Sequence, residues 1–226
     1  MILSPTVQSH LVKVYTALAA TSGTAAVGAH LQMKQYIQWN EFLSALLGMF
    51  LLSAVLFLLP KTKQNQTTRL ACLLGFGFCE GVSVTPLLSL AVNLNMGHVV
   101  VQALVSTTLI FASFSIGALM ARRGSMLYIG GLLMSVLSVM MWMSFFNIFI
   151  GSRSVMNAEL YLGLVVFAGF VVYDTQLIVE KCLRGDVDFL SHSAELFVDV
   201  FGVFVRLLVI LMKKEEQKQR RRRKDD

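Results

Sequence analysis

Seven apolar stretches constrain this chain most strongly, because each is close to the length that crosses a bilayer as a helix. A spanning helix needs about 20 mostly apolar residues to cross a hydrocarbon core about 30 Å thick. The short segments between the stretches leave no room for a water-soluble domain. The sequence therefore predicts an all-α polytopic membrane protein. Its predicted membrane segments are 14–31, 42–59, 70–92, 99–120, 126–150, 158–180 and 189–212.

Composition supports the same class. Hydrophobic residues make up 56% of the 226 residues and charged residues only 14%, whereas soluble domains carry roughly 25% charged residues. We predict one membrane domain over 14–212, between a cytosolic N-terminus at 1–13 and a basic tail at 213–226. We expect a lipid bilayer around it and no nucleic-acid partner, because a nuclear-localisation signal makes no sense on a polytopic chain.

Basic residues set the expected orientation, since Lys and Arg favour the cytosolic side of a membrane. Segments 60–69 and 121–125 carry such residues and are predicted to be cytosolic, with the N-terminus on the same side. Seven full spans would then leave the basic tail outside. Segment 189–212 therefore either spans the membrane against the rule or re-enters it with the tail inside. The predicted fold is six transmembrane helices surrounding or flanking this polar seventh helix.

Charged side chains inside the apolar segments are the candidate functional residues. Each costs about 2.5–3.5 kcal/mol at bilayer depth on insertion scales, so such residues face the interior of a bundle and usually have partners. The candidates are Glu80, Asp174, Glu195, Asp199 and Arg206.

The last apolar segment carries a polar stripe. Steps of three and four residues put its members on one helical face, which must look into a bundle or a watery cavity. A structural pair between Asp199 and Arg206 is the alternative interpretation. The stripe consists of His192, Glu195, Asp199, Gly202 and Arg206.

Asp174 and Asp199 lie on consecutive predicted helices. If they face each other, repulsion and desolvation prevent both from being ionised, so they would share a proton and titrate as a pair. Such a pair would form a proton-operated latch, closed while the proton bridges the carboxyls and open when both are charged. Carboxylates are also hard oxygen ligands for Ca²⁺. Together with Glu195 they would bind it weakly, as a transient passage site.

The third apolar segment contains Gly77 and Gly81 on either side of Glu80. The spacing Gly77-x-x-x-Gly81 permits close packing of two helices. Glu80, beside this close-packed segment, is a candidate residue of an ion pathway, as are Glu195, Arg206 and His192.

The C-terminal tail is a solvated stop that fixes orientation, a site for anionic lipid, or a retrieval signal of the endoplasmic reticulum. Its basic residues are the candidates for regulation by the tail. They include Lys213, Lys214, Arg220, Arg221, Arg222 and Arg223.

Enzyme motifs do not occur in the sequence, which lacks a P-loop, His-Glu-x-x-His and Gly-x-Ser-x-Gly. An intramembrane aspartyl protease would need Gly-x-Gly-Asp at its second aspartate, and this chain has Phe197-Val198-Asp199 there. We therefore predict that the protein is not an enzyme.

Several motifs resemble the Bax inhibitor-1 (transmembrane Bax inhibitor motif) family, and the similarity runs essentially end to end. The most specific are Tyr173-Asp-Thr-Gln176 and Leu196-Phe-Val-Asp199. Further matches are Gly185-Asp-Val-Asp-Phe189, Ala118-Leu-Met-Ala-Arg-Arg123 and Tyr128-Ile-Gly-Gly-Leu-Leu-Met-Ser135.

The resemblance implies a multi-pass protein of the endoplasmic-reticulum membrane that suppresses cell death and provides a pH-sensitive Ca²⁺ leak. In that family, the aspartates matching Asp174 and Asp199 form the di-aspartyl pH sensor. The tail contributes to regulation, and Ca²⁺ is a permeant ion rather than a cofactor. Bcl-2-family proteins and Ca²⁺ channels of the endoplasmic reticulum are the implied partners, and the unfolded protein response is the implied setting.

One departure from the family concerns a latch. Bacterial relatives join an arginine of the second helix to the aspartate of the sixth, but segment 42–59 contains no Lys or Arg. Lys61, Lys63 or Arg206 substitutes for it, or the latch is absent. The alternative function is a non-conducting scaffold that binds death-pathway or Ca²⁺-channel proteins.

Overall fold

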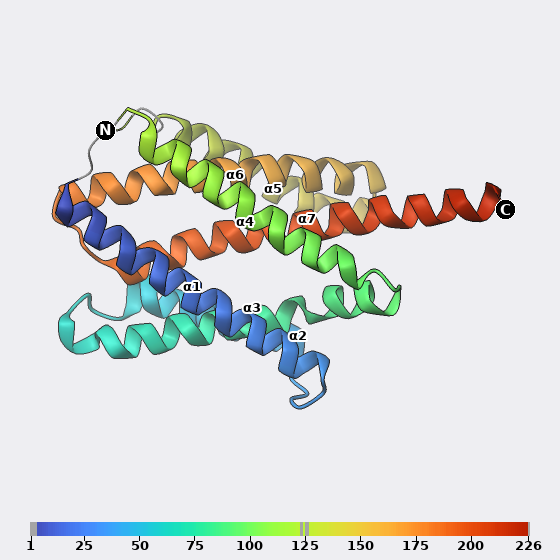
Figure 1. Cartoon of the computed structure of the whole chain (residues 1–226), viewed down its shortest axis with the longest axis horizontal. Coiled ribbons are helices and arrows are strands. Elements are labelled where there is room, and N and C mark those ends of the chain that lie inside the picture. Colours follow the sequence, from blue (N-terminus) through green and yellow to red (C-terminus); the bar gives the residue numbers. More distant parts are fainter. Residues whose placement is uncertain (1–3, 123, 125–126, 226) are drawn as a thin grey trace. The chain divides into compact units, whose positions relative to one another are not determined.

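A computed structural model describes residues 4–122, 124 and 127–225, and the regular elements within them are helices (Figure 1). Each predicted apolar stretch corresponds to one long helix. These are α1 (Pro5–Met33), α2 (Glu41–Ser53), α3 (Gln66–Asn93), α4 (Gly97–Met120), α5 (Ile129–Ile150), α6 (Arg153–Leu183) and α7 (Phe189–Asp225). A π-helical turn, η1 (Ala54–Leu58), and a 3₁₀ turn, η2 (Lys63–Asn65), lie between α2 and α3.

The helices form two compact units. The N-terminal unit consists of Ile2–Asn93 and Lys181–Val198, and the C-terminal unit consists of Leu94–Glu180 and Asp199–Asp226. Helices α6 and α7 contribute residues to both.

Glycines allow α1 and α3 to approach closely in the N-terminal unit. A Cβ atom on Gly77 would collide with the backbone of Thr21, and one on Gly81 would collide with the carbonyl of Ala25. Only a residue without a side chain fits at either position. The prediction that the Gly77-x-x-x-Gly81 motif serves close helix packing is confirmed.

The C-terminal unit has an apolar core between α5 and α6. Gly130 at the start of α5 lies against the ring of Tyr173 on α6, which brings the two helices together at that end. The buried members of this core are Leu133, Met140, Val166 and Phe170.

Among the described residues, five helical segments are long and apolar enough to cross a membrane. They are Glu41–Leu58, Lys63–Asn93, Gly97–Met120, Ile129–Ile150 and Arg153–Leu183. The prediction of seven apolar spans is therefore confirmed for five, and the arrangement of six spans with a polar seventh stays an expectation. Helix α1 falls outside the set because small and weakly polar residues interrupt its apolar side chains, and α7 because it carries many ionic ones.

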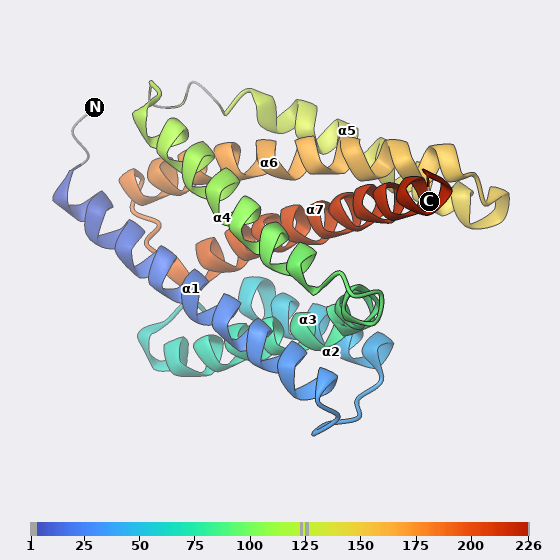
Figure 2. The ribbon, with the colours of Figure 1, turned by 45° about the vertical axis from the view of Figure 1, so that its right-hand side comes forward.

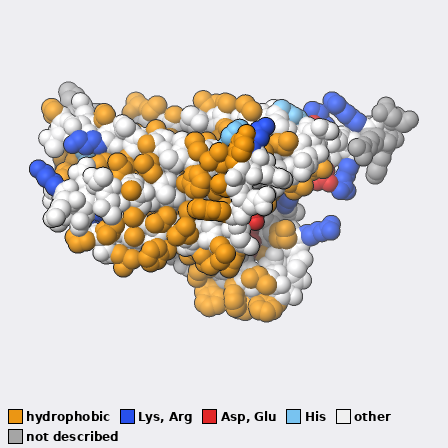
Figure 3. Space-filling model, turned by 90° about the horizontal axis from the view of Figure 1, so that it is seen from below, with side chains coloured by type: hydrophobic (Ala, Val, Ile, Leu, Met, Phe, Trp, Pro, Cys, Tyr) orange, Lys and Arg blue, Asp and Glu red, His pale blue; other side chains and the backbone are white. Residues whose placement is uncertain are grey.

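Large apolar side chains point outward from the candidate spans. On α5, for example, Trp142, Phe145, Phe146 and Phe149 are all exposed, and Figure 3 shows hydrophobic side chains over much of the face in view. Soluble monomers rarely expose contiguous apolar patches larger than a few hundred Å². These surfaces are suited to lipid.

Helix α7 continues well beyond the predicted end of the last membrane segment at residue 212. It contains 37 residues, which corresponds to a length of about 55 Å. Lys213 donates a hydrogen bond to the side-chain carbonyl of Asn157 on α6 (2.8 Å), and Arg220 pairs with Glu216 one turn away (2.6 Å). The basic tail is thus the last part of a helix.

Candidate functional site

Helices α6 and α7 pair in an antiparallel manner within the C-terminal unit (Figure 2). Gly202 of α7 lies against the ring of Phe167 on α6, and Gly163 of α6 lies against the side chain of Arg206 on α7. The Arg206 guanidinium carbon is 4.2 Å from the centroid of the Phe167 ring. These contacts define both the register of the pair and the faces that meet.

Asp174 and Asp199 lie on these meeting faces. Asp199 precedes Gly202 by three residues and Asp174 follows Phe167 by seven, and both spacings return to the same side of an α-helix. In the register of Gly202 against Phe167, Asp199 is level with residue 170. Asp174 is therefore about one turn, or ~6 Å, further along α6. Asp199 is 5% exposed and Asp174 is half-buried, and each interacts with neighbouring groups. Their role as a pH sensor stays a prediction.

Polar contacts fix the part of α6 that carries Asp174. The side-chain amide of the buried Gln176 donates a hydrogen bond to the carbonyl of Ala118 at the end of α4 (3.0 Å). The hydroxyl groups of Thr175 and Ser115 are 3.5 Å apart. Because a helix turns by about 100° per residue, anchoring two successive residues to α4 also fixes the direction in which Asp174 points.

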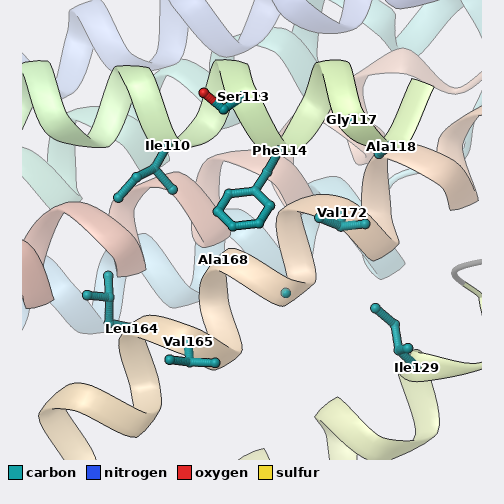
Figure 4. A pocket seen from close by; sticks show the side chains of 11 residues that line it. Ile110, Ser113, Phe114, Gly117, Ala118, Ile129, Leu164, Val165, Ala168 and Val172 are labelled. Carbon is teal, nitrogen blue, oxygen red and sulfur yellow. The ribbon is translucent and has the colours of Figure 1, made fainter. Parts of the chain in front are cut away.

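An apolar groove of about 670 Å³ lies between α4, α5 and α6 in the same unit. In Figure 4, Ile110 and Phe114 of α4 face Leu164, Ala168 and Val172 of α6. Ca²⁺ requires six to eight oxygen ligands, and this lining is almost entirely hydrocarbon. The groove is suited to an acyl chain and not to an ion.

The polar stripe of α7 is divided between different partners. His192 Nδ1 is 3.0 Å from His10 Nε2. Glu195 forms an ion pair with Lys181, with a distance of 3.3 Å between the carboxylate oxygen and the ammonium nitrogen. Both contacts belong to the N-terminal unit. Arg206, in the C-terminal unit, donates to the carbonyl of its own helix at position 202 (3.1 Å) and lies over an aromatic ring. The alternative interpretation, a structural pair between Asp199 and Arg206, stays an interpretation.

Glu80 belongs to the N-terminal unit, whereas Asp174 and Asp199 belong to the C-terminal unit. Its carboxylate accepts a 3.4 Å hydrogen bond from Ser83 and lies against Gly48 of α2. Its proposed place in an ion pathway stays a prediction.

The N-terminal unit contains a buried ionic network that was not predicted from the sequence. Arg69 is only 3% exposed, and it donates to both carboxylate oxygens of Asp188 at 2.8 and 2.7 Å. Ser191 donates a hydrogen bond to the same carboxylate at 2.7 Å, and Lys61 is 3.3 Å from it. Asp188 lies just before α7, so the network joins the start of α7 to α3 and to the α2–α3 connection.

A proline explains why Arg69 also contacts the backbone of η1. In a π-helical turn the carbonyl of Val55 would accept from the amide of residue 60, but Pro60 has no N–H. The neighbouring bond of the turn, from Leu59 N–H to the Ala54 carbonyl, is present (3.0 Å). Arg69 donates to the Val55 carbonyl through two nitrogen atoms, at 2.9 and 3.3 Å.

The network holds Asp188 in its ionised form. Burial by itself would raise the pKa of this carboxyl, but the hydrogen bonds from Arg69 and Ser191 and the charge of Arg69 outweigh burial and hold the pKa of Asp188 well below its usual range. The pair is therefore ionic at physiological pH.

Two buried histidines join α1 to α7 near this network. His10 and His192 are 5% and 1% exposed, and their rings meet edge to face. The hydroxyl of Ser193 donates to the carbonyl of Val14, also on α1 (2.6 Å). Burial lowers the pKa of His10, and the charge of Lys13 acts in the same direction while Asp186 opposes it.

Weak signals in the sequence pointed to this network. Arg69 is a single cation at the start of a long apolar stretch, where a basic residue indicates the cytosolic side of a membrane. Asp188 directly precedes a helix, where acidic residues are common as caps. Neither signal identifies the partner, because 119 residues separate the two in sequence.

The basic residues proposed for regulation by the tail lie on the exposed end of α7, and Lys213 is half-buried. The side chain of Arg223 lies outside the described part of the chain. Within that part, no group of three or more His, Cys, Asp and Glu residues is arranged to hold a metal ion. Transient binding of Ca²⁺ by Asp174 and Asp199 therefore stays a prediction about an ion in passage.

Comparisons with known proteins agree on one family. A family model described as inhibitor of apoptosis-promoting Bax1 matches residues 7–216. Bax inhibitor 1 of Homo sapiens is 40% identical over 207 residues, which cover 92% of this chain and 86% of the human protein. Bax inhibitor 1 of Drosophila melanogaster is 42% identical over 205 residues (91% and 82%). Bax inhibitor 1 of Arabidopsis thaliana is 40% identical over 208 residues (92% and 82%).

Proposed function

Because this chain belongs to the Bax inhibitor-1 family, we propose that it suppresses cell death from the membrane of the endoplasmic reticulum. We further propose that it provides a pH-sensitive Ca²⁺ leak there, gated by Asp174 and Asp199. The family assignment supports an anti-apoptotic, multi-pass membrane protein. The organelle, the leak and its gate are the proposal.

One structural observation supports the proposed gate. The two aspartates occupy the meeting faces of an antiparallel helix pair, about one turn apart in the register that Gly202 and Phe167 define. Carboxylates this close repel each other when both are ionised, and burial of Asp199 increases the cost.

The pair would act through a shared proton. With one proton between them, the two carboxyls attract each other and hold α6 and α7 together, which is the closed state. With both ionised they separate, and each supplies oxygen ligands to a passing Ca²⁺. Since two carboxylates fall well short of the six to eight oxygens that Ca²⁺ prefers, the ion would bind weakly enough to leave.

Reconstitution in liposomes tests this function. The full chain is inserted into vesicles loaded with Ca²⁺, and efflux is followed with an external Ca²⁺ dye from acid to alkaline pH. For the wild type we expect efflux that rises with pH. For the double variant Asp174→Asn with Asp199→Asn we expect efflux that no longer responds to pH, because neither amide can ionise.

A charge-matched control separates the gate from the general effect of losing two acids. Glu41→Gln with Glu216→Gln removes the same number of carboxylates outside the pair, at the start of α2 and on the exposed end of α7, and we expect it to keep the wild-type pH response. If the Asp174/Asp199 double variant keeps the pH response as well, the gate is wrong.

The exposed, charged end of α7 favours a second candidate function, a scaffold for death-pathway or Ca²⁺-channel proteins. Side chains such as Lys214, Arg221 and Arg222 are exposed on a helix rather than on an irregular tail, which makes a regular surface for a partner. Deleting 213–226 separates the two functions. Loss of protection against cell death with Ca²⁺ efflux intact supports the scaffold, whereas unchanged protection contradicts it.

A further inference from the structure

A polar cavity of about 570 Å³ lies in the N-terminal unit, and neither Asp174 nor Asp199 lines it. Its volume is within the range of pockets that bind small molecules. Three segments that are distant in sequence form it: the first turns of α1, the α2–α3 connection and the α6–α7 loop. The polar residues among those lining it are Thr6, Ser9, His10, Lys13, Lys61, Thr62, Lys63, Gln66, Arg69, Asp186 and Asp188.

The charges around the cavity favour an anion. Four cations and two carboxylates line it, which leaves an excess of two positive charges. Asp188 balances Arg69 and also lies 3.3 Å from Lys61. Lys13 and Lys63, which are exposed and come from different segments, make no ion pair with any described residue. They supply the excess charge.

The hydrogen-bonding groups point to the same kind of ligand. The carboxylate of Asp188 already accepts bonds from Arg69 and Ser191, and that of Asp186 accepts the backbone N–H of residue 188 (3.1 Å). Most of the remaining lining groups are ammonium, hydroxyl and amide donors. A ligand with several acceptor oxygens and negative charge would satisfy them, and a metal cation would not.

The cavity lies at one end of a candidate membrane span. Lys63 is the first residue of the span Lys63–Asn93, so the cavity is at the level where a bilayer exposes phosphate headgroups. Basic pockets at this level on the cytosolic side bind phosphorylated lipid headgroups. Because Lys and Arg favour the cytosolic side of a membrane, we expect this segment to be cytosolic.

We propose that this cavity binds a phosphomonoester group, held by Lys13 and Lys63 and by the hydroxyl donors beside them. A phosphorylated inositol lipid of the membrane and a soluble inositol phosphate share this chemistry. The site does not depend on the Ca²⁺ leak or on the aspartate pair.

The test uses the purified full chain in nanodiscs and two separate probes. In one arm the nanodiscs consist of phosphatidylcholine with phosphatidylinositol phosphate, and retained lipid is counted by native mass spectrometry. In the other arm they consist of phosphatidylcholine alone, and soluble inositol bisphosphate is titrated by calorimetry. Retention in the first arm alone identifies a lipid ligand, and heat of binding in the second identifies a soluble one.

The double variant Lys13→Gln with Lys63→Gln is the decisive change, because both side chains are exposed and support no other part of the fold. Each lysine near a phosphate contributes roughly a fivefold gain in affinity, so we expect the double variant to bind about thirtyfold more weakly. Lys214→Gln with Lys218→Gln, on the exposed end of α7, is the matched control and is expected to bind as the wild type does.

Asp186→Asn gives a test in the opposite direction. Removing one of the two carboxylates increases the positive excess, so the variant should bind the phosphate probes more tightly, whereas a cation site would be weakened. The proposal is overturned if neither probe binds, if the Lys13/Lys63 variant binds like the wild type, or if only the α7 variant loses binding.

Discussion

Buried charge in this protein is balanced residue by residue, and Arg69 is the clearest case. Its guanidinium is almost completely enclosed and donates to both oxygens of Asp188, to Ser191 and to the Val55 carbonyl. A buried ion pair of this kind adds little stability over a well-packed apolar pair, but breaking it by removing one partner is costly. The Arg69–Asp188 pair fixes the start of α7 against α3.

Replacing Asp188 should therefore destabilise the protein strongly. In Asp188→Asn the charge of Arg69 remains buried without a counter-charge, and we expect the free energy of unfolding to fall by about 3–5 kcal/mol at neutral pH. Denaturant titration in detergent micelles measures this loss. The matched change Glu216→Gln breaks an exposed pair with Arg220 and should cost at most about 1 kcal/mol.

The loss of stability in Asp188→Asn should also depend on pH. Because the pKa of Asp188 is lowered in the folded protein, its contribution is present above the carboxyl pKa of the unfolded chain, near 3.9, and disappears as pH falls below that value. The difference between wild type and Asp188→Asn should shrink in strong acid. A difference that stays constant from neutral pH into strong acid would contradict the ionic account.

His10 leads to a prediction with its own pH range. Burial lowers its pKa, so the folded protein keeps it neutral while the unfolded chain takes up a proton near pH 6.5. The free energy of unfolding should thus fall as the pH drops below about 6.5. We expect His10→Gln to reduce this slope by up to about 1.4 kcal/mol per pH unit, as measured by denaturant titration at several pH values. His30→Gln, at an exposed position on the same helix, is the matched control, and an unchanged slope in His10→Gln would contradict the prediction.

The candidate residues differ in how far sequence could identify them. Acids within apolar stretches are conspicuous, so Asp174 and Asp199 stand out, and periodicity also indicates the faces on which they lie. Arg69 and Asp188 were not identified as candidates because each lies at the end of a segment, where charged side chains are common. The choice of partner depends on how distant segments meet, and helical spacing contains no information about that.

Helices were the most predictable level of the structure. Seven apolar stretches became seven long helices, because an apolar segment in a bilayer must satisfy its backbone groups internally. Helix α7 ends at residue 225, 13 residues beyond the predicted end of its membrane segment at 212. Hydropathy indicates where a segment leaves the apolar phase and not where its helix ends. The Glu, Lys, Gln and Arg residues beyond 212 are all good helix formers, and they pair one turn apart.

The close packing of α6 against α7 depends on the absence of a side chain at Gly202. Gly202→Ala would push a methyl group into the ring of Phe167, and overpacking of this kind costs about 1–3 kcal/mol. We expect a lower midpoint of thermal unfolding. Gly117→Ala is the control, because nothing lies within 4 Å of a Cβ there and Ala is better than Gly in a helix by roughly 0.5–1 kcal/mol. Equal effects of the two substitutions would contradict the packing account.

At the scale of the whole molecule, α6 and α7 link the two compact units, since each helix belongs to both. The C-terminal unit contains the aspartate pair, and the N-terminal unit contains the Arg69–Asp188 network and the basic cavity. Asp188, in the loop that joins α6 to α7, belongs to this network. Sequence predicted the class of the molecule and its family, but not this division, which depends on contacts between distant segments.

The separation of the Asp174 and Asp199 carboxyl groups, in structures determined in lipid at acid and at alkaline pH, tests the proposed gate most directly. At acid pH we expect oxygen atoms of the two groups within hydrogen-bonding distance, about 2.5–3.0 Å, because a proton joins them. At alkaline pH we expect the groups to move apart, and α6 and α7 with them. The same separation at both pH values, or a shorter one at alkaline pH, would contradict the account.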